Sequence, residues 1–499
     1  MTIRTAVTAM AVTLAAALTM TLMPGSATAA VTPAPEPTTV TTDVPPQVAE
    51  GEDVVAPPAP TDTAPTDPAP TDTAPTDTAP PQSSAAEVAA PTTTTIAAPA
   101  QFTLRRPVTV SAHVAGTGET GATGTIRFEQ QTAAGWTVLS DVAVDAAGNA
   151  ALTTTFATTP VTLRATYLGA EGHDPSTSAP TTLTGVPQPA SVRLNAPRSI
   201  VDERTLKLSA KVTTPYASVP GATVSFQVFR DRKWRTYASA RTDGAGVARV
   251  RSQPRTTYRY RAVVTGADWY TGAKSATRKV KNTPPGKVIT LPKKAPRPTK
   301  LPAQPRASGS GANATTSTLS SSVWSSMPGR SWRAGCPVGR ADLRIVRVNY
   351  WGFDGYRHRG EIVVHRSIAG KTARLFTDLH KNKVSIRAMY RVDRFGYSAT
   401  LRGANDYASM ARDNTSGFNC RNVVGRPGVR SPHAYGRAID INPFENPYRA
   451  GRWIPNSWWH TRAVGTYAWT RSSHLVPRIM KRNGFRWTYG NLDAHHFDG

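Results

Sequence analysis

The feature that most constrains the fold is an internal repeat with an offset of about 97 residues. Residues 124–129 and 222–227 have closely similar sequences, and each is followed by a Trp and then by a turn rich in Asp and Gly. Short alternating strands that are separated by Gly, Asp and Pro turns, in units of this size, are typical of β-sandwiches. The sequence therefore predicts two β-sandwiches in tandem.

Both units resemble bacterial immunoglobulin-like repeats in pattern and size. On this resemblance the first repeat spans residues 101–187 and the second spans residues 188–283. In each repeat the first matching strand is followed by a Trp, Trp136 or Trp234. A Trp in such a unit usually packs inside, so both are expected in the sandwich cores, and stacking on a sugar is the alternative.

The N-terminal part is predicted to direct export. Residues 1–29 have the features of a signal peptide: Arg4, an apolar run over residues 6–23, and small side chains at the expected cleavage site. The alternative, an uncleaved anchor, is disfavoured because the run is short for a span. Residues 30–100 are rich in Pro, Thr, Ala and Asp, which predicts a disordered spacer. The mature chain is expected to be secreted or associated with the cell wall, without a membrane span.

Residues 284–322 are first basic and Pro-rich and then rich in Ser and Gly, which predicts an extended linker. The formal net charge of +27 predicts an anionic partner, and a composition that serves solubility alone is the alternative. Because the chain is expected to be exported, anionic wall polymers are the expected partner and nucleic acid is not. The sequence does not indicate an oligomeric state, and we assume a monomer.

The chain has two cysteines, Cys336 and Cys420. An exported chain folds in an oxidising compartment, where a disulfide is the default state of such a pair. Zinc ligation by these cysteines would need further thiolates or a nearby His. We therefore predict a disulfide between them.

The C-terminal region, residues 323–499, contains two histidine motifs. In the first, His433 and Asp440 are seven residues apart, with Gly436 between them to allow a turn. Asp440 lies between two isoleucines on a predicted strand, and a buried carboxylate is costly unless it is paired or bound to metal. This motif predicts two metal ligands.

The second motif places Asp493 three residues before His496. A catalytic zinc ion keeps three protein ligands and one open position for water. His433, Asp440 and His496 would supply the three ligands, and Asp493 would be free to accept a proton from the bound water. His495 is the alternative to His496 as a ligand.

Together the motifs resemble the zinc D-alanyl-D-alanine carboxypeptidase family, which includes VanY-like enzymes and L-alanyl-D-glutamate endopeptidases. The family carries Ser-x-His-x-x-Gly-x-Ala-x-Asp, then an acid three residues before a His that is followed by Phe or Trp. The matching residues here are Ser431, His433, Gly436, Ala438, Asp440, Asp493, His496 and Phe497. The resemblance covers about residues 323–499.

The resemblance implies a role for each matching residue. It makes His433, Asp440 and His496 the ligands of Zn²⁺ and Asp493 the general base. An Asp rather than a Glu in the base position is typical of the endopeptidase branch.

Two further residues have roles by the same resemblance. Arg421 would hold the substrate carbonyl and stabilise the developing oxyanion, although the spacing around it departs from the family pattern. Ser431 would form a hydrogen bond beside the ligands.

We expect a small α+β catalytic domain with a central antiparallel sheet that holds the metal at its face. The expected strands are residues 342–350, 360–365 and 438–441, and the expected helix is residues 368–382. The predicted function is hydrolysis of peptide bonds in the peptide stems of peptidoglycan by a secreted zinc peptidase, either a carboxypeptidase or an endopeptidase. The alternative is a non-catalytic wall-binding or adhesin-like protein that works through its repeats.

Overall fold

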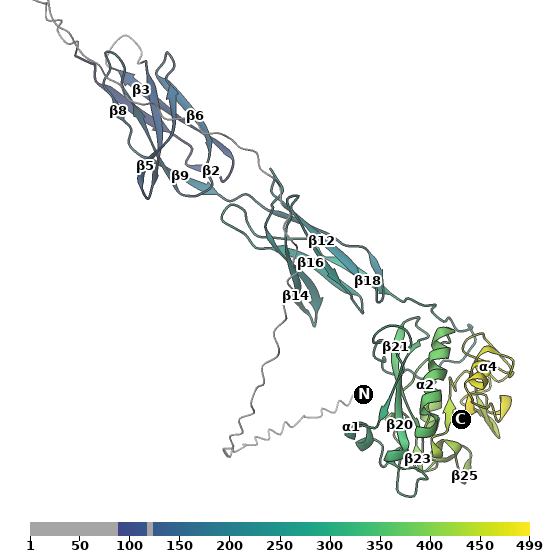
Figure 1. Ribbon diagram of the computed structural model, residues 1–499. Helices are drawn as coiled ribbons and strands as arrows, with labels where there is room; N and C mark the ends of the chain where they lie inside the picture. The colour runs from purple at the N-terminus through teal and green to yellow at the C-terminus, as the bar shows by residue number, and fades with distance from the viewer. Residues whose placement is uncertain (1–87, 117–122) are drawn as a thin grey trace, which may run out of the picture. The chain divides into compact units, whose positions relative to one another are not determined.

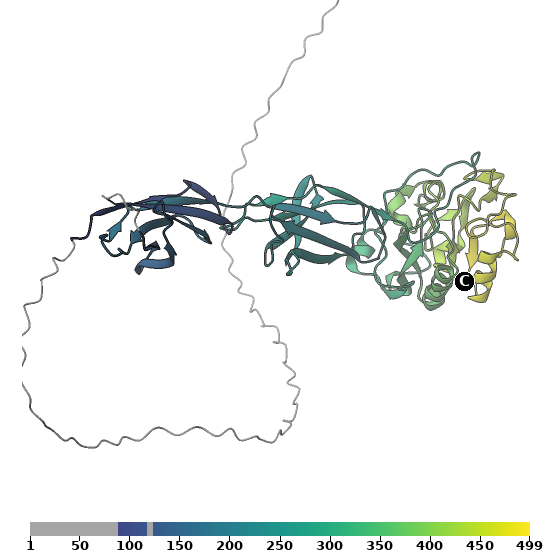
Figure 2. The same cartoon turned by 90° about the horizontal axis from the view of Figure 1, so that it is seen from above.

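The computed structural model describes residues 88–116 and 123–499. The predicted signal peptide and most of the predicted spacer lie outside these residues. Three folded regions follow one another along the described chain: two β-sandwiches and a C-terminal α+β region (Figures 1 and 2). In the described residues, no helix is both long and apolar enough to cross a membrane.

The first sandwich packs a three-stranded sheet against a larger one. Along its strands, buried apolar residues alternate with exposed polar ones, and the inward set forms a single core. The smaller sheet has the order β1 (Thr92–Ala97), β3 (Pro107–Gly116), β6 (Asn149–Thr155). The larger has the order β2 (Gln101–Thr103), β9 (Thr181–Val186), β7 (Val161–Tyr167), β4 (Thr125–Thr132), β5 (Gly135–Ala143), with β8 (Ser176–Thr177) beside β7.

The second sandwich repeats this topology strand for strand, which confirms the predicted tandem of sandwiches. Its smaller sheet has the order β10 (Ser191–Asn195), β12 (Leu206–Thr213), β15 (Val247–Ser252). Its larger sheet has the order β11 (Ser199–Val201), β18 (Arg278–Thr283), β16 (Tyr258–Val264), β13 (Thr223–Arg230), β14 (Lys233–Arg241), with β17 (Ala273–Lys274) beside β16.

The two repeat tryptophans are not core residues, so that prediction is wrong. Trp136 and Trp234 are only half-buried, near the ends of the β4–β5 and β13–β14 hairpins. An arginine guanidinium lies 4.3 Å above each ring, from Arg164 in the first repeat and Arg261 in the second. The core positions that a Trp would fill are taken by smaller apolar side chains of the alternating strands, and the cation–π contact covers the outward ring instead.

The C-terminal region is built on a three-stranded antiparallel sheet and two larger helices. The sheet consists of β19 (Thr315–Thr318), β20 (Leu343–Trp351) and β21 (Arg357–His365), and the helices are α2 (Arg366–Lys381) and α4 (Leu475–Arg482). Short hairpins surround it: β22–β23 (Tyr397–Ser398, Gly403–Ala404), β24–β25 (Asn422–Val423, Arg426–Arg430), β26–β29 (Ala438–Asp440, His496–Asp498) and β27–β28 (Tyr448–Ala450, Arg452–Ile454). The short helices are α1 (Ser321–Ser325), α3 (Asp406–Met410) and the 3₁₀ turns Arg340–Asp342, Val392–Phe395, Pro432–Tyr435 and Gly490–Leu492.

Helix α2 occupies the position expected from the sequence and begins two residues earlier. The side chain of His365 caps its start by accepting a hydrogen bond from the Ser367 backbone N–H at 3.2 Å. The helix buries one face against the sheet. The buried residues on that face recur about every three or four positions, as helix geometry requires. The buried residues are Ile368, Ala369, Thr372, Leu375, Phe376 and Leu379.

The predicted borders of the folded regions need two corrections. Strand β1 belongs to the first sandwich although it lies within the predicted spacer, because its Thr-rich sequence supplies β-branched residues that suit a strand. Strand β19 pairs with β20 although it lies within the predicted linker. In the same linker, the Gln304 side chain is buried and hydrogen-bonds both the N–H and the C=O of Met389 at 2.8 Å. Part of the linker is therefore integral to the C-terminal region.

Cys336 and Cys420 form a disulfide, with their Cα atoms 6.0 Å apart and a separation of 84 positions in the sequence. The described residues contain no free cysteine. Cys420 is buried, and its backbone N–H donates to the Ser331 carbonyl at 2.8 Å. The cross-link thus attaches the segment just before Arg421 to the start of the C-terminal region.

Candidate metal centre and cavity

Three short segments bring His433, Asp440 and His496 together. Asp440 and His496 are directly opposite each other in the antiparallel pair β26–β29, which places their side chains on the same face. His433 comes from the 3₁₀ turn Pro432–Tyr435, which ends at Gly436 in the left-handed region, with φ of 66°. A Cβ at Gly436 would lie 2.8 Å from the backbone N of His365, so the turn requires glycine for space as well as for its backbone conformation.

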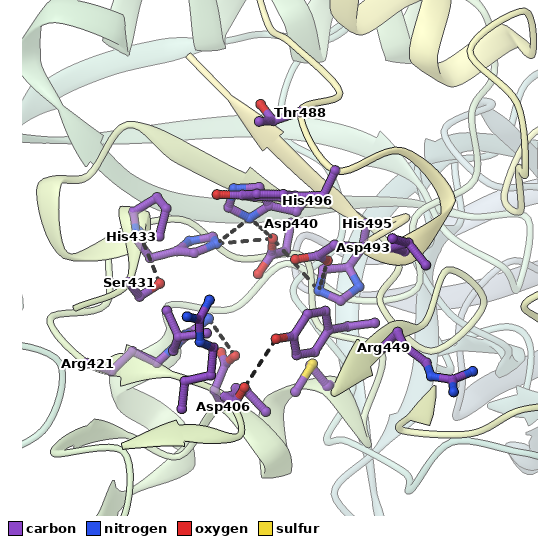
Figure 3. Close-up of a pocket in the computed structure, with 18 residues that line it drawn as sticks. Asp406, Arg421, Ser431, His433, Asp440, Arg449, Thr488, Asp493, His495 and His496 are labelled. Carbon is purple, nitrogen blue, oxygen red and sulfur yellow. Dashed lines mark hydrogen bonds and ion pairs between the residues drawn. The ribbon is translucent and has the colours of Figure 1, made fainter. Parts of the chain in front are cut away.

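The three ligand atoms form a nearly equilateral triangle (Figure 3). His433 Nε2 lies 3.1 Å from Asp440 Oδ1 and 3.0 Å from His496 Nδ1, and His496 Nδ1 lies 3.1 Å from Asp440 Oδ1. All three residues are buried, each with an exposed fraction of 3% or less. The lone pairs of two imidazole nitrogens and a carboxylate oxygen converge at these distances and would repel one another. A shared cation or proton between the three atoms removes this repulsion.

Neighbouring acceptors fix which nitrogen of each imidazole faces the triangle. His433 Nδ1–H donates to the Gly417 carbonyl at 2.7 Å, which leaves Nε2 free to bind a cation. His496 Nε2–H donates to Asp498 Oδ1 at 3.1 Å, which leaves Nδ1 free in the same way. Second hydrogen bonds of this kind orient histidine ligands in metal sites and strengthen them as donors.

The donor set fits a small divalent metal ion. Two imidazoles and one carboxylate are a usual ligand set for zinc, and bonds of about 2.0 Å in a tetrahedral site separate the ligand atoms by about 3.3 Å. The observed separations of 3.0–3.1 Å are close to this value. Of the described His, Cys, Asp and Glu residues, these three form the one group of three or more with metal-binding spacing.

The triangle does not lie on the face of the central sheet, so that expectation is wrong. It lies on the separate two-stranded ladder β26–β29, while the central sheet is β19–β20–β21. The ladder is anchored because Ile439 and Phe497, each fully buried, pack into the same core as the central sheet and α2. The alternation that places Ile439 inward places Asp440 on the opposite face, toward the cavity.

The electrostatics of the triangle are dominated by burial and by mutual contacts. Burial alone would raise the pKa of Asp440, but the charges of His433 and His495 and the hydrogen bonds outweigh it and hold that pKa well below its usual value. Burial opposes the charged form of His496, yet hydrogen bonds to Asp440 and Asp498 raise its pKa to about 10. The site therefore favours a negative carboxylate with positive charge beside it.

Asp493 lies beside the triangle and lines the same cavity. Its Oδ1 is buried and accepts no hydrogen bond, although His495 Nε2 lies 3.3 Å away. Burial raises the pKa of Asp493, and the neighbouring Asp440 charge adds to that rise. A buried carboxylate with an unused oxygen and a raised pKa can accept a proton within the cavity.

His495, the alternative ligand, is used elsewhere. Its Nδ1–H donates to the Asn446 carbonyl at 2.6 Å, and its Nε2 lies 3.9 Å from Asp440 Oδ1. It is outside the metal-spaced group. His495 therefore lies next to Asp493 and outside the triangle of ligand atoms.

Arg421 lies across the cavity from the triangle (Figure 3). Its guanidinium contacts Asp406 at 2.7 Å, and both side chains are at most 7% exposed. The sequence does not single out Asp406, because one Asp in helix α3 belongs to no motif. The Nε of Arg421 is buried without a hydrogen-bond partner, and other atoms of the residue line the cavity.

The cavity that these residues line has a volume of about 440 Å³. Besides the triangle, Asp493 and Arg421, it is lined by apolar and aromatic side chains and by further arginines. Ser431 also lines it and caps the turn by accepting a hydrogen bond from the His433 N–H at 3.3 Å. The lining that remains includes Met410, Val424, Arg426, Tyr448, Arg449, Tyr489 and Leu492.

Comparisons with known families agree with this arrangement. A family model for D-alanyl-D-alanine carboxypeptidase matches residues 424–499, which contain the whole triangle and Asp493 but not Arg421. A family model for the bacterial Ig-like domain (group 3) matches residues 93–185, the first sandwich. The chain thus combines a bacterial Ig-like domain with a domain of the D-alanyl-D-alanine carboxypeptidase type, as the sequence motifs predicted.

Comparisons with whole proteins add little. No curated protein matches the chain. Among solved structures, the tetra-tandem repeat in the extending region of a large adhesion protein is 10% identical with a TM-score of 0.24, and the match covers 56% of this chain and 64% of that one. The D0-D1 domain of Intimin is 15% identical with a TM-score of 0.16, over 38% of this chain and 97% of that one.

A third solved structure, the sulfur carrier protein SoxY from Chlorobium limicola f thiosulfatophilum, is 18% identical with a TM-score of 0.14. That match covers 18% of this chain and 73% of SoxY. All three scores are too low to support any statement about function.

Proposed function

We propose that this protein is an exported zinc peptidase that hydrolyses peptide bonds in the peptide stems of peptidoglycan. The observation that carries the proposal is the buried triangle of His433, Asp440 and His496, with Asp493 in the same cavity. The match of residues 424–499 to the carboxypeptidase family supports the reaction class. The bacterial Ig-like match of the first sandwich supports a location outside the cell.

His433, Asp440 and His496 would hold the ion. When bound, zinc lowers the pKa of a coordinated water and polarises a carbonyl oxygen. The triangle suits this role because it offers three protein ligands and faces the cavity, which leaves the fourth coordination position open to water or substrate.

The chain's own residues do the rest of the work. Asp493 accepts the proton of the attacking water on its carboxylate and returns it to the leaving amine. Arg421 donates from its guanidinium to the substrate carbonyl and stabilises the negative charge that develops there. Asp406 is a positioning residue, because its contact with Arg421 holds the guanidinium against the cavity wall.

The bond that is cut is either the terminal D-Ala bond or one within the stem, and Asp493 in the base position favours the second by resemblance. Mass spectrometry of peptidoglycan fragments treated with the protein, with zinc or with a chelator, tests the proposal. Zinc-dependent loss of a terminal D-Ala identifies a carboxypeptidase, and zinc-dependent cutting within the stem identifies an endopeptidase.

The matched variants are His433→Ala and His460→Ala. The first removes a corner of the triangle, and the second removes a histidine outside the cavity lining. We expect activity to vanish only in the first. Unchanged fragments with folded, zinc-loaded wild-type protein would support the wall-binding alternative instead.

A further inference from the structure

The two sandwiches share a topology but carry very different charge. Residues 101–187 contain four Lys and Arg against six Asp and Glu, whereas residues 188–283 contain 19 Lys and Arg against five Asp and Glu. The fold itself does not require the basic residues, because the first sandwich folds without them. The charge of the second sandwich therefore calls for a separate explanation.

Part of this charge is concentrated on the outer face of the sheet β10–β12–β15. Arg193, Lys207, Lys211 and Arg251 are exposed there. Arg193 is directly opposite Lys211, and Lys207 is directly opposite Arg251. Like charges in opposite positions of a sheet are destabilising, so the pairing has a cost for the fold.

No acidic side chain offsets these four cations. The three strands contain no Asp or Glu. Within residues 88–116 and 123–499, none of the four forms a salt bridge or a side-chain hydrogen bond. Arg249, a fifth cation on the same face, differs from these four because it forms a salt bridge with Asp243. The four charges remain available to a partner.

The first sandwich provides an internal comparison at the same positions. In β1, β3 and β6 the corresponding residues, 98 positions earlier, are Thr95, Thr109, His113 and Thr153. The cross-strand pairs are the same, since Thr95 is opposite His113 and Thr109 is opposite Thr153. One sheet geometry thus presents a nearly neutral face in the first repeat and a cationic face in the second.

The cationic face is also hollowed. A surface hollow of about 460 Å³ is lined by Lys207, Arg249 and Arg251 together with Asn195 and Ser209. The polar part of the lining therefore combines cations with an amide and a hydroxyl, which are donors for an anion, and the rest of the lining is apolar.

We propose that this face of the second sandwich binds a wall polymer with repeating phosphate groups. The two cross-strand pairs each place cations about 5 Å apart, and the pairs lie about 13 Å from each other along β12, so they match a chain of repeated anions better than one isolated carboxylate. The three strands carry no aromatic residue, and single-stranded nucleic acid is usually bound by stacking on aromatics. A polyanion without bases is therefore the partner that the face fits.

The test measures binding of the full mature chain to poly(glycerol phosphate) by fluorescence anisotropy over a range of NaCl concentrations. The variant combines Arg193→Thr, Lys207→Thr, Lys211→His and Arg251→Thr, which are the residues that the first sandwich has at these positions. We expect binding at 50 mM salt to weaken by more than about tenfold. The slope of log affinity against log salt should also fall in magnitude by about three.

A control variant removes four exposed cations from the other sheet of the same sandwich, Lys233, Arg259, Lys279 and Lys281, each to Thr. Its net charge equals that of the test variant. Retained binding in the control supports the proposed face, whereas equal loss in both variants overturns it and leaves only net charge as the cause.

Two further arms complete the test. Combining Thr95→Arg, Thr109→Lys, His113→Lys and Thr153→Arg in the first sandwich should strengthen polymer binding, and no gain would contradict the proposal. Single-stranded DNA with an equal number of phosphates serves as the competing ligand. Tighter binding of the DNA through the same four residues would assign the face to nucleic acid and overturn the proposal.

Discussion

Reduction of the Cys336–Cys420 disulfide should destabilise the C-terminal region by an amount that the loop length sets. The two residues are 84 positions apart, so the cross-link closes a loop that contains the central sheet strands β20 and β21 and helix α2. In the chain-entropy description, closing a loop of this size in the unfolded chain stabilises the fold by about 4–5 kcal/mol. We expect the free energy of unfolding to fall by this amount on reduction.

Urea unfolding of the oxidised and the reduced wild-type protein, followed by tryptophan fluorescence, measures the effect. Eight of the 11 tryptophans lie in the C-terminal region, so the signal reports mainly on its unfolding. The reduced protein keeps both sulfur atoms, and the comparison therefore isolates the cross-link from changes in packing. The slope of the free energy against urea should rise on reduction, because the unfolded chain becomes more open.

A variant with Cys336→Ala and Cys420→Ala serves as the matched control. It should be about as unstable as the reduced wild type, with a small further loss at Cys420, which is 1% exposed. A difference below about 1 kcal/mol between oxidised and reduced wild type would refute the reasoning. It would mean that the unfolded chain is already restricted without the cross-link.

Three further predictions concern the cavity and helix α2. Asp493→Asn should lower the turnover rate by about 10²–10⁴-fold and leave one bound zinc per chain by metal analysis, because the residue moves a proton and is not a ligand. Asp498→Asn should weaken zinc affinity by about 10–100-fold in competition with a chromogenic chelator, because His496 loses the acceptor that orients it; unchanged affinity would contradict this role. Burial lowers the pKa of His380 to about 4, so stability should be lost as pH falls from about 6.5 toward 4, where the unfolded chain takes up the proton more readily. Because His380 is partly exposed, we expect the free energy of unfolding at pH 4.5 to fall by only about 1–2 kcal/mol, measured by urea unfolding. The variant His380→Gln should not show this fall.

The sequence was most informative where chemistry depends on local spacing. His433, Gly436 and Asp440 form a turn followed by a strand, and both the turn and the strand are where the pattern predicted them. His496 was joined to them by the need for a third zinc ligand and by the resemblance, because no local pattern links it to Asp440, which is 56 positions away in the sequence and opposite it in the β26–β29 pair. Asp406 and the Gly417 carbonyl were not predictable, because they reach the site through tertiary packing alone.

Composition was a weaker guide than periodicity. Residues 284–322 are rich in Pro, Ser and basic residues, yet a buried Gln304 and strand β19 make part of them structural. Such contacts are formed with partners distant in sequence, which composition does not reveal. Trp136 was misplaced for a related reason, because its size suggested burial while the strand alternation directed it outward, beneath Arg164.

The opposition of Asp440 and His496 across β26–β29 also links the ion to conformational stability. In the unfolded chain these ligands are 56 positions apart along the sequence, so the folded ladder would bind a metal ion far more tightly than the unfolded chain does. Free metal at a hundred times its dissociation constant would then add about 2.7 kcal/mol to stability. Chelation should accordingly first loosen the final strand, while α2, which holds none of the ligands, should stay protected from hydrogen exchange.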